Sequence, residues 1–275
     1  IDLFPHSNDN NCVTNITLEG SGVREENLSP YIEKRVTNRK PYSKKLLEVG
    51  VLGSIAHTTL NNIRVVSTRD QNSIRTLGQT ASVNEEIMFQ NKTLHEFFFS
   101  HINWDEQEDA EKRAGFYIKT LELPGPAKGL FKLIRHWPVM RAFNGIGLYK
   151  KISAQNGALY GTATGFIAFV ARDTSPRSYI EVGRALEQTW LRATKEGLSV
   201  QPLTGVLFFM RHLESGTHVF SSREAMTIKT AYEKIKTTLC IEANEYVLII
   251  IRIGYANKPS AQARRFPFEK VVTWQ

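Results

Sequence analysis

The segment Arg35-Val36-Thr37-Asn38-Arg39, followed by Lys40-Pro41-Tyr42, decides how this chain is interpreted. In an extended segment, alternate residues face the same way, so Arg35, Thr37 and Arg39 line one side. At the end of a helix, Arg35 and Arg39 again share a face because they are four residues apart. Both conformations bring two guanidinium groups close to a hydroxyl, a donor set that suits a phosphate. The alternative is a solvated basic turn, since such triplets are common.

Three more segments follow in a fixed order. They are 179–186 running on to 196–205, then Gly254-Tyr255, then Arg264-Arg265-Phe266-Pro267. Together with the first motif, over roughly residues 31–270, they resemble the nitroreductase family of FMN-dependent oxidoreductases, in a divergent branch. That family opens with Arg-x-Ser/Thr-x-Arg, has a long central helix that ends in a Gly-Leu pair, and closes with Gly-Tyr and an Arg-rich tail.

The resemblance implies a fold, an assembly and an activity. The fold is α+β, nitroreductase-like, with a central mixed or antiparallel sheet flanked by helices, and the protein is a homodimer. The activity is FMN-dependent reduction of small electrophiles such as nitroaromatics or quinones, with NAD(P)H as electron donor, by ping-pong hydride transfer. Two alternatives remain open: a non-catalytic protein that binds or stores flavin, and a degenerate interaction domain without flavin.

The resemblance also implies the residues that hold noncovalent FMN. Arg35, Thr37, Arg264 and Arg265 match the phosphate end, and Arg39 matches the basic side chain near the N1/C2 edge of the ring. The loop beside the ring corresponds to Pro202, Leu203, Thr204 and Gly205. No catalytic side chain is expected, because the flavin carries the redox chemistry.

The chain departs from the family pattern at one segment. The family has Pro-Ser-x-x-Asn-x-Gln-Pro-Trp before its first core strand, whereas residues 55–63 read Ile-Ala-His-Thr-Thr-Leu-Asn-Asn-Ile. Thr59 replaces the Asn, Asn61 replaces the Gln, and the Pro and Trp are missing. Hydrogen bonds to the edge of the ring would therefore come from Asn61.

The composition is that of a soluble globular protein, with 275 residues, 41% hydrophobic and 23% charged. The two cysteines are far apart and have no metal-ligand spacing, which favours a reducing, cytoplasmic location. No signal peptide is recognisable. The strongest apolar run, residues 246–251, is broken by Arg252 and is far shorter than the ~20 residues that span a bilayer. No GxSxG elbow, HExxH, P-loop or GxGxxG fingerprint is present.

The net charge of +8 is concentrated in one stretch. Residues 123–172 contain no Asp or Glu, and their cations are Lys128, Lys132, Arg135, Arg141, Lys150, Lys151 and Arg172. Three interpretations are open: a solvated helical face, a region that attracts NADPH or an anionic substrate, and an anionic membrane surface as partner, since aromatic residues are interleaved. Nucleic acid is not expected, because no recognised binding module is present.

The pattern also predicts the organisation of the chain. Residues 1–28 form an N-terminal arm, and residues 29–275 form the FMN-binding domain, with a basic helical insertion at about 123–160. Helices are expected from Ser29 and over 43–52, 71–98, 104–114, 127–135, 177–195 and 222–236. Strands are expected over 63–67, 164–171, 205–210, 246–253 and 268–274.

Overall fold

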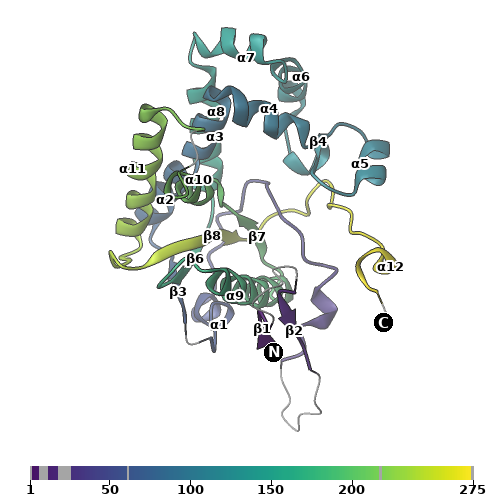
Figure 1. Cartoon of the computed structure of the whole chain (residues 1–275), viewed down its shortest axis with the longest axis vertical. Helices are drawn as coiled ribbons and strands as arrows, with labels where there is room; N and C mark the ends of the chain where they lie inside the picture. Colours follow the sequence, from purple (N-terminus) through teal and green to yellow (C-terminus); the bar gives the residue numbers. More distant parts are fainter. Residues whose placement is uncertain (1, 6–11, 18–25, 61, 217–218, 274–275) are drawn as a thin grey trace.

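A four-stranded antiparallel sheet is the centre of the computed structural model (Figure 1). The structure describes residues 2–5, 12–17, 26–60, 62–216 and 219–273. The strand order is β3-β6-β8-β7, with β3 (Ile63–Thr68) and β7 (Ser199–Pro202) at the edges and β6 (Gly165–Ala171) and β8 (Tyr246–Gly254) inside. All three pairings are antiparallel. The predicted α+β class, a central sheet flanked by helices, is confirmed, and its sheet is antiparallel throughout.

Helices cover both faces of this sheet. One face of β6, with Phe166 and Ala168, packs in the same cluster as α2 (Gln71–Ala81), α10 (Gly205–Glu214) and α11 (Ser222–Thr238). The opposite face packs against α1 (Val51–Ile55) and α9 (Pro176–Lys195). Because β6 is buried on both faces, its sequence is a continuous apolar run without alternation.

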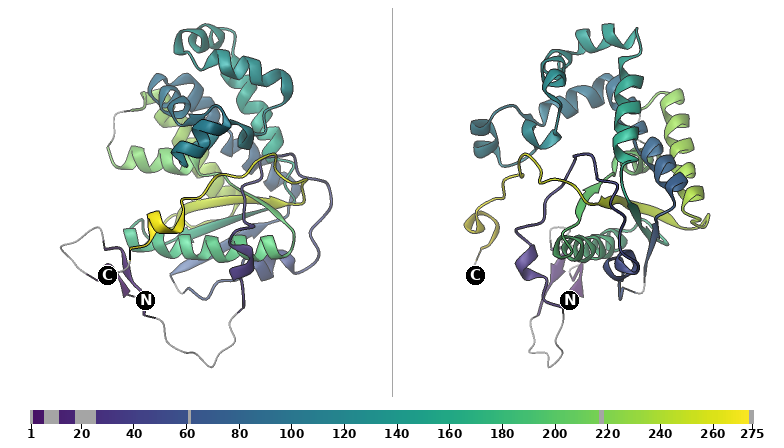
Figure 2. Two further views of the ribbon diagram at one scale, coloured as in Figure 1. Left: turned by 90° about the vertical axis from the view of Figure 1, so that its right-hand side faces the viewer. Right: turned by 180° about the vertical axis from the view of Figure 1, so that it is seen from behind.

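A helical lobe extends beyond one end of the sheet (Figures 1 and 2). It has its own cluster of buried side chains, in which Phe89, Phe99, Phe131 and Met140 take part. The lobe and its surroundings comprise α3 (Val83–Gln90), α4 (Lys92–Ser100), β4 (Ile102–Asn103), α5 (Glu106–Lys112), β5 (Phe116–Tyr117), η2 (Ile118–Leu121), α6 (Gly125–Ile134), α7 (Trp137–Asn144) and α8 (Leu148–Tyr160). The remaining short elements are β1 (Asp2–Leu3), β2 (Thr14–Asn15), η1 (Ser29–Tyr31) and α12 (Phe268–Val271).

The lobe joins the sheet layer through a close contact between α2 and α8. A Cβ added at Gly78 would lie 2.7 Å from the Gly161 nitrogen and 2.9 Å from the Gly157 oxygen. Both neighbours are backbone atoms that have little room to move, so only glycine permits this approach.

Most predicted elements are confirmed. The expected strands at 63–67, 164–171 and 246–253 correspond to β3, β6 and β8. The expected helix over 71–98 is present as the three consecutive helices α2, α3 and α4. The helices expected at 104–114, 127–135, 177–195 and 222–236 are α5, α6, α9 and α11.

Four predicted elements are wrong. Residues 43–50 are not helical, and α1 begins only after Gly50, whose φ of 88° is left-handed. Residues 205–210 form the start of α10 instead of a strand, because a short apolar run is compatible with either element. Phe268–Val271 is the helix α12, and residues 274–275 of the expected strand lie outside the described part. Ser29 starts only a 3₁₀ turn, since its hydroxyl donates to Asn27 Oδ1 at 2.7 Å and caps no helix.

The division into an arm of residues 1–28, a domain from residue 29 and an insertion at about 123–160 stays a prediction. Much of the proposed arm lies outside the described residues. No helix in the described part of the chain is long and apolar enough to cross a membrane.

His95 is a buried histidine in the helical lobe, and it leads to a prediction about pH. Its Nε2 lies 2.8 Å from the Ile134 carbonyl oxygen, and its ring is in contact with Phe99 and Trp137. Nδ1 has no hydrogen-bond partner. Burial lowers the pKa of His95 below its ordinary 6.5, so the folded protein keeps this ring neutral.

The unfolded chain therefore takes up this proton first as the pH falls. The His95 contribution to stability is complete above pH ~6.5 and is lost at lower pH, at up to about 1.4 kcal/mol per pH unit. We expect His95→Gln to remove this dependence. Urea unfolding between pH 5 and 7.5 measures it, with the exposed His57→Gln as control. Parallel curves for wild type and His95→Gln would contradict the prediction.

Candidate functional site

The motif at 35–39 is extended and lies beside the edge strand β7. Thr37 forms a parallel β-bridge with Val200, and the Asn38 N–H donates to the Val200 carbonyl at 2.9 Å. The Asn38 side chain is buried and donates through Nδ2 to Ser199 Oγ at 3.0 Å and to the Asn257 carbonyl at 2.9 Å. Of the two conformations that the sequence allowed, the extended one is present.

The C-terminal tail runs beside the same segment (Figure 1, yellow). Gln262 Nε2 donates to the Glu33 carbonyl at 3.0 Å, and the Arg265 guanidinium donates to the Ile32 carbonyl. These contacts and the Asn38–Asn257 hydrogen bond hold two segments together that are far apart in sequence. The first motif is therefore adjacent both to the strand before Gly205 and to the tail that carries Arg264 and Arg265.

The guanidinium groups do not point at one position, because each has a protein partner. Arg35 Nε lies 2.9 Å from Glu187 Oε1, an ion pair without hydrogen-bond alignment, and its guanidinium lies over the Trp190 ring at 4.6 Å. Arg39 Nη1 donates to the Thr120 carbonyl at 3.1 Å. The pKa of Arg39 is lowered by burial.

Arg264 has the strongest anionic surroundings of the predicted residues. Its Nε lies 3.2 Å from Asp109 Oδ2, and its Nη2 lies 3.1 Å from Glu106 Oε1. A cavity of about 440 Å³ borders these side chains, and Tyr117, Lys119 and the tail residues 260–263 also line it. Of the predicted phosphate ligands, only Arg264 lines this cavity.

The loop at 202–205 leads from β7 into α10. The Leu203 N–H donates to the Ile250 carbonyl at 2.9 Å, which fixes the loop on the sheet. Thr204 is the N-cap residue and makes no side-chain cap, so the first N–H groups of α10 lack a side-chain acceptor there. Gly205 packs directly on Asn84, so a Cβ added at this position would lie 1.9 Å from Asn84 Oδ1. Asn61, predicted at the edge of the ring, lies outside the described residues.

Sequence analysis missed a buried polar cluster behind the motif. Arg252 of β8 is 0% exposed, and its guanidinium lies 4.0 Å from the centre of the Tyr42 ring. Nη2 of Arg252 donates to the Lys40 carbonyl at 2.9 Å, and Nε donates to Gln201 Oε1 at 2.8 Å. Tyr160 extends the cluster to Glu85, to whose Oε1 it donates at 2.6 Å. The sequence signal was the arginine that breaks an otherwise apolar strand.

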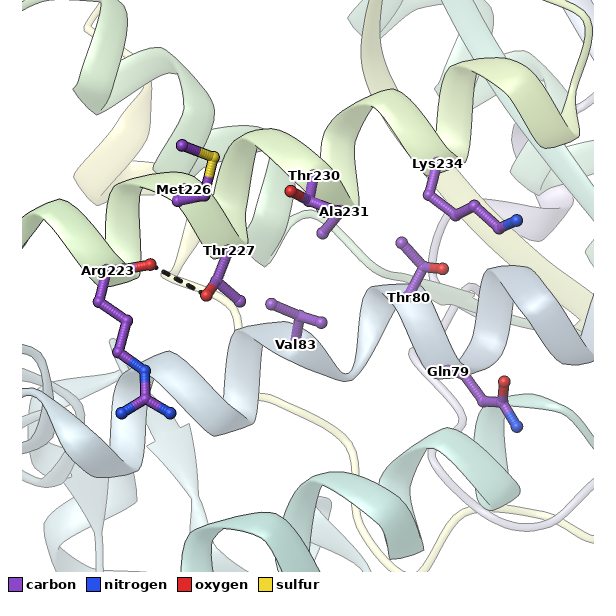
Figure 3. A pocket seen from close by; sticks show the side chains of 9 residues that line it. All are labelled: Gln79, Thr80, Val83, Arg223, Met226, Thr227, Thr230, Ala231 and Lys234. Atoms are coloured by element: carbon purple, nitrogen blue, oxygen red, sulfur yellow. Dashed lines mark hydrogen bonds between the residues drawn. The ribbon is translucent and has the colours of Figure 1, made fainter.

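A second cavity is lined by other residues. It is a groove of about 560 Å³ between α11 and the junction of α2 and α3 (Figure 3). Val83 and Ala231 line it, and Arg223 and Lys234 lie toward its two ends. None of the predicted site residues lines this groove. Within the described ranges, no group of three or more His, Cys, Asp or Glu side chains could hold a metal ion.

Comparison with known proteins finds similarity only at the level of structure. No protein-family model matches the chain, and no curated protein matches it. An FMN- and NADPH-dependent nitroreductase from sphigopyxis sp. strain HMH has a TM-score of 0.49 at 13% identity, covering 91% of this chain and 99% of that one. A nitroreductase with bound FMN from Bacteroides fragilis has a TM-score of 0.46 at 10% identity, covering 91% and 100%.

An NADPH:FMN oxidoreductase from Vibrio harveyi, in complex with NAD⁺, has a TM-score of 0.47 at 12% identity. The match covers 90% of this chain and 77% of that one. Each of these solved structures is named as a nitroreductase or an FMN oxidoreductase, the family that the ordered sequence motifs resemble.

Proposed function

We propose that this chain binds FMN noncovalently and acts as an oxidoreductase that transfers electrons from NAD(P)H to small electrophiles such as nitroaromatics or quinones. One observation carries the proposal: the extended 35–39 segment is paired with β7 on one side and linked to the 257–265 tail on the other. The three segments that carry the predicted donor groups for a phosphorylated ring ligand are thereby adjacent.

The predicted donor set has the chemistry that the phosphate end of such a ligand requires, although its guanidinium groups have protein partners in this structure. We assign this end to Arg35, Thr37, Arg264 and Arg265, which supply charge-assisted donors and a hydroxyl. Arg35 contacts α9 through both its ion pair with Glu187 and its position over the Trp190 ring. The ion pair lacks hydrogen-bond alignment, so replacing Glu187 by a phosphate would cost little interaction energy. Arg264 must be shared with Glu106 and Asp109, so it contributes less.

The other predicted residues are assigned to the flavin ring. We assign the 202–205 loop to the ring, because N–H groups at the start of α10, which the Thr204 side chain does not cap, can donate to ring heteroatoms. Arg39 is the fixed positive charge that stabilises negative charge on the ring, since a buried cation needs no reorganisation to do so. Bound FMN would accept a hydride from NAD(P)H and then reduce the electrophile.

The first test is flavin binding by the purified protein. We expect a yellow protein that quenches FMN fluorescence. Arg35→Ala should weaken FMN binding by about 1.5–3 kcal/mol, because it removes a charged hydrogen-bond donor. Arg64→Ala is the matched control, since Arg64 also forms an ion pair, with Glu245, but lies on β3 at the opposite edge of the sheet. A colourless protein without quenching would instead identify a degenerate interaction domain.

The second test separates turnover from storage. For an enzyme we expect parallel reciprocal plots when NADPH and a quinone are varied together, as in ping-pong kinetics. A protein that holds FMN but oxidises neither NADH nor NADPH would be a storage or sequestration protein. The carboxylate partners that Arg35 and Arg264 already have favour the other alternative, a degenerate domain without flavin.

Two further parts of the proposal concern the setting of the protein. We propose a homodimer, which sedimentation equilibrium tests directly. We also propose a reducing, cytoplasmic location, because the sequence has only two cysteines and they lie far apart in the chain.

A further inference from the structure

The outermost part of the helical lobe is formed by α6 and α7, which lie far from the sheet in every view (Figures 1 and 2). Their inner side is fixed by buried Phe131, Ile134 and Met140 in the cluster of the lobe. The outer side of α6 is thereby held in a defined orientation at one extremity of the molecule.

This outer side combines apolar and cationic side chains. Leu130 is 38% exposed and Leu133 is 50% exposed, although both are large and apolar. Lys128 and Lys132 are exposed on the same helix and are interleaved with the leucines. With 100° per residue, Leu133 and Lys132 lie next to each other on the face opposite Phe131 and Ile134.

The charge of this region is not neutralised within the described part of the chain. None of the ion pairs found there includes Lys128, Lys132, Arg141, Lys150 or Lys151. The guanidinium of Arg135 lies over the Trp104 ring at 5.4 Å, a contact that leaves its charge in place.

Acidic residues that precede the stretch have other partners. Glu122 pairs with Lys40, Glu106 and Asp109 pair with Arg264, and Glu108 pairs with Lys112. Arg172 belongs to a different region, because it acts on Glu245 near the opposite edge of the sheet. The uncompensated cations are therefore those of the lobe, and the basic stretch of the sequence is not a single patch.

We propose that the exposed face of α6 docks on an anionic phospholipid surface. Interfacial helices bind in this way, with apolar side chains entering the boundary between headgroups and acyl chains while lysines contact anionic headgroups. Exposed leucines favour lipid over a phosphodiester backbone, which offers them no apolar contact. Docking at this extremity leaves the segment at 35–39 and the tail away from the bilayer, and it needs no bound flavin.

The test is co-sedimentation of the full chain with vesicles of phosphatidylcholine alone and with 30% phosphatidylserine. We expect binding only to the anionic vesicles, and loss of binding as salt rises from 0.05 to 0.5 M, since screening shortens the Debye length to below ~10 Å. Each lysine near the surface contributes about five-fold to partitioning, so Lys128→Gln with Lys132→Gln should weaken it about 30-fold.

A matched control and an apolar variant make the test specific. Lys229→Gln with Lys234→Gln removes the same charge from exposed positions on α11 and should leave binding nearly unchanged. Leu133→Ser should weaken binding at every salt concentration, because it removes apolar contact and no charge. Thermal unfolding of each variant verifies that the fold is intact.

Other outcomes overturn the proposal. Equal binding to both kinds of vesicle, or equal losses in the α6 and α11 double variants, would mean that α6 is not the docking face. Salt-dependent binding to duplex DNA without vesicle binding would identify a nucleic-acid surface instead. Salt-dependent NADPH oxidation without vesicle binding would assign the charge to the electron donor.

Discussion

Arg252→Met is expected to lower the free energy of unfolding by about 3–5 kcal/mol, the largest effect of any single change considered. Arg252 has no exposed surface and no carboxylate partner among the described residues. Its guanidinium donates to Gln201 Oε1 at 2.8 Å and to the carbonyls of Leu159 and Lys40 at 2.8 Å and 2.9 Å.

Two opposing terms decide the size of this effect. Methionine relieves the cost of burying a cation, which is several kcal/mol, and burial accordingly lowers the pKa of Arg252. Methionine also leaves the buried Gln201 oxygen and two partly buried carbonyls without a donor, at up to about 1–3 kcal/mol each, and gives up the contact with the Tyr42 ring at 4.0 Å. The acceptors come from separate segments that cannot close around a thioether, so the second term is the larger one.

Arg252→Lys distinguishes charge from geometry. Lysine keeps the charge but lacks the planar fork that reaches separate acceptors, so we expect an intermediate loss of about 1–2 kcal/mol. Arg64→Met, at the exposed edge of the same sheet, serves as the control. Urea unfolding followed by circular dichroism measures all three variants. Wild-type stability in Arg252→Met would mean that the cost of burying the charge cancels the whole hydrogen-bond cluster.

Arg252→Met should also affect the proposed flavin site. Arg252 fixes the Lys40 carbonyl, and Tyr42 donates through its N–H to Thr162 Oγ1 at 2.9 Å, so the end of the 35–42 segment is fastened to the sheet and to the turn after α8. We therefore expect Arg252→Met to weaken FMN binding although Arg252 is not among the residues assigned to the ligand. A variant that unfolds too easily can be examined at low temperature with saturating FMN.

The sequence predicted those parts of the fold that local pattern determines. Apolar runs marked β6 and β8, and helical periodicity marked α9. It failed where one pattern allows two elements: the run from Gly205 became α10, because Val206 and Leu207 both pack into the core. It also missed β7, since four residues with alternating polarity carry too little signal.

The sequence could predict which segments form the candidate site. It could not predict which ion pairs the arginines of those segments make. The order of the motifs suggested that 35–39 and 264–265 come together, and the tail side chains Gln262 and Arg265 do donate to the carbonyls of residues 33 and 32, just before the motif. The predicted convergence of guanidinium groups depends on which carboxylates lie nearby, and the proximity of Asp109 to Arg264 is a tertiary contact without a local sequence signal. Their joint action on one phosphate remains a prediction.

Glu85→Gln is expected to change how stability depends on pH, by about 3 kcal/mol between pH 4 and pH 8. Glu85 lies on α3, is buried, and accepts a hydrogen bond from Tyr160 at 2.6 Å through one oxygen. Its other oxygen, Oε2, has no hydrogen-bond partner. Burial raises the pKa of Glu85 to about 7 from its ordinary 4.5, against the lowering effect of the Tyr160 hydrogen bond.

The sign follows from the protons bound in each state. Between pH 4.5 and 7 the folded protein keeps the Glu85 proton while the unfolded chain has lost it, so wild-type stability falls as the pH rises through this window. Glutamine is neutral at every pH and still accepts the Tyr160 hydrogen bond. We therefore expect Glu85→Gln to be close to wild type at pH 4 and more stable than wild type at pH 8.

The experiment is chemical unfolding of both proteins at intervals from pH 4 to pH 8, reported as the difference in free energy of unfolding. Glu86→Gln, one residue further on α3 and partly exposed, is the control and should give a nearly constant difference. His95 titrates in an overlapping range but contributes equally to both proteins, so it cancels in the difference. If the Glu85→Gln difference is also constant, water must reach Oε2 and the carboxylate ionises in the folded state with its ordinary pKa. The neighbouring Asn84, against which Gly205 packs, would then border a hydrated space at the start of α10 rather than a dry one.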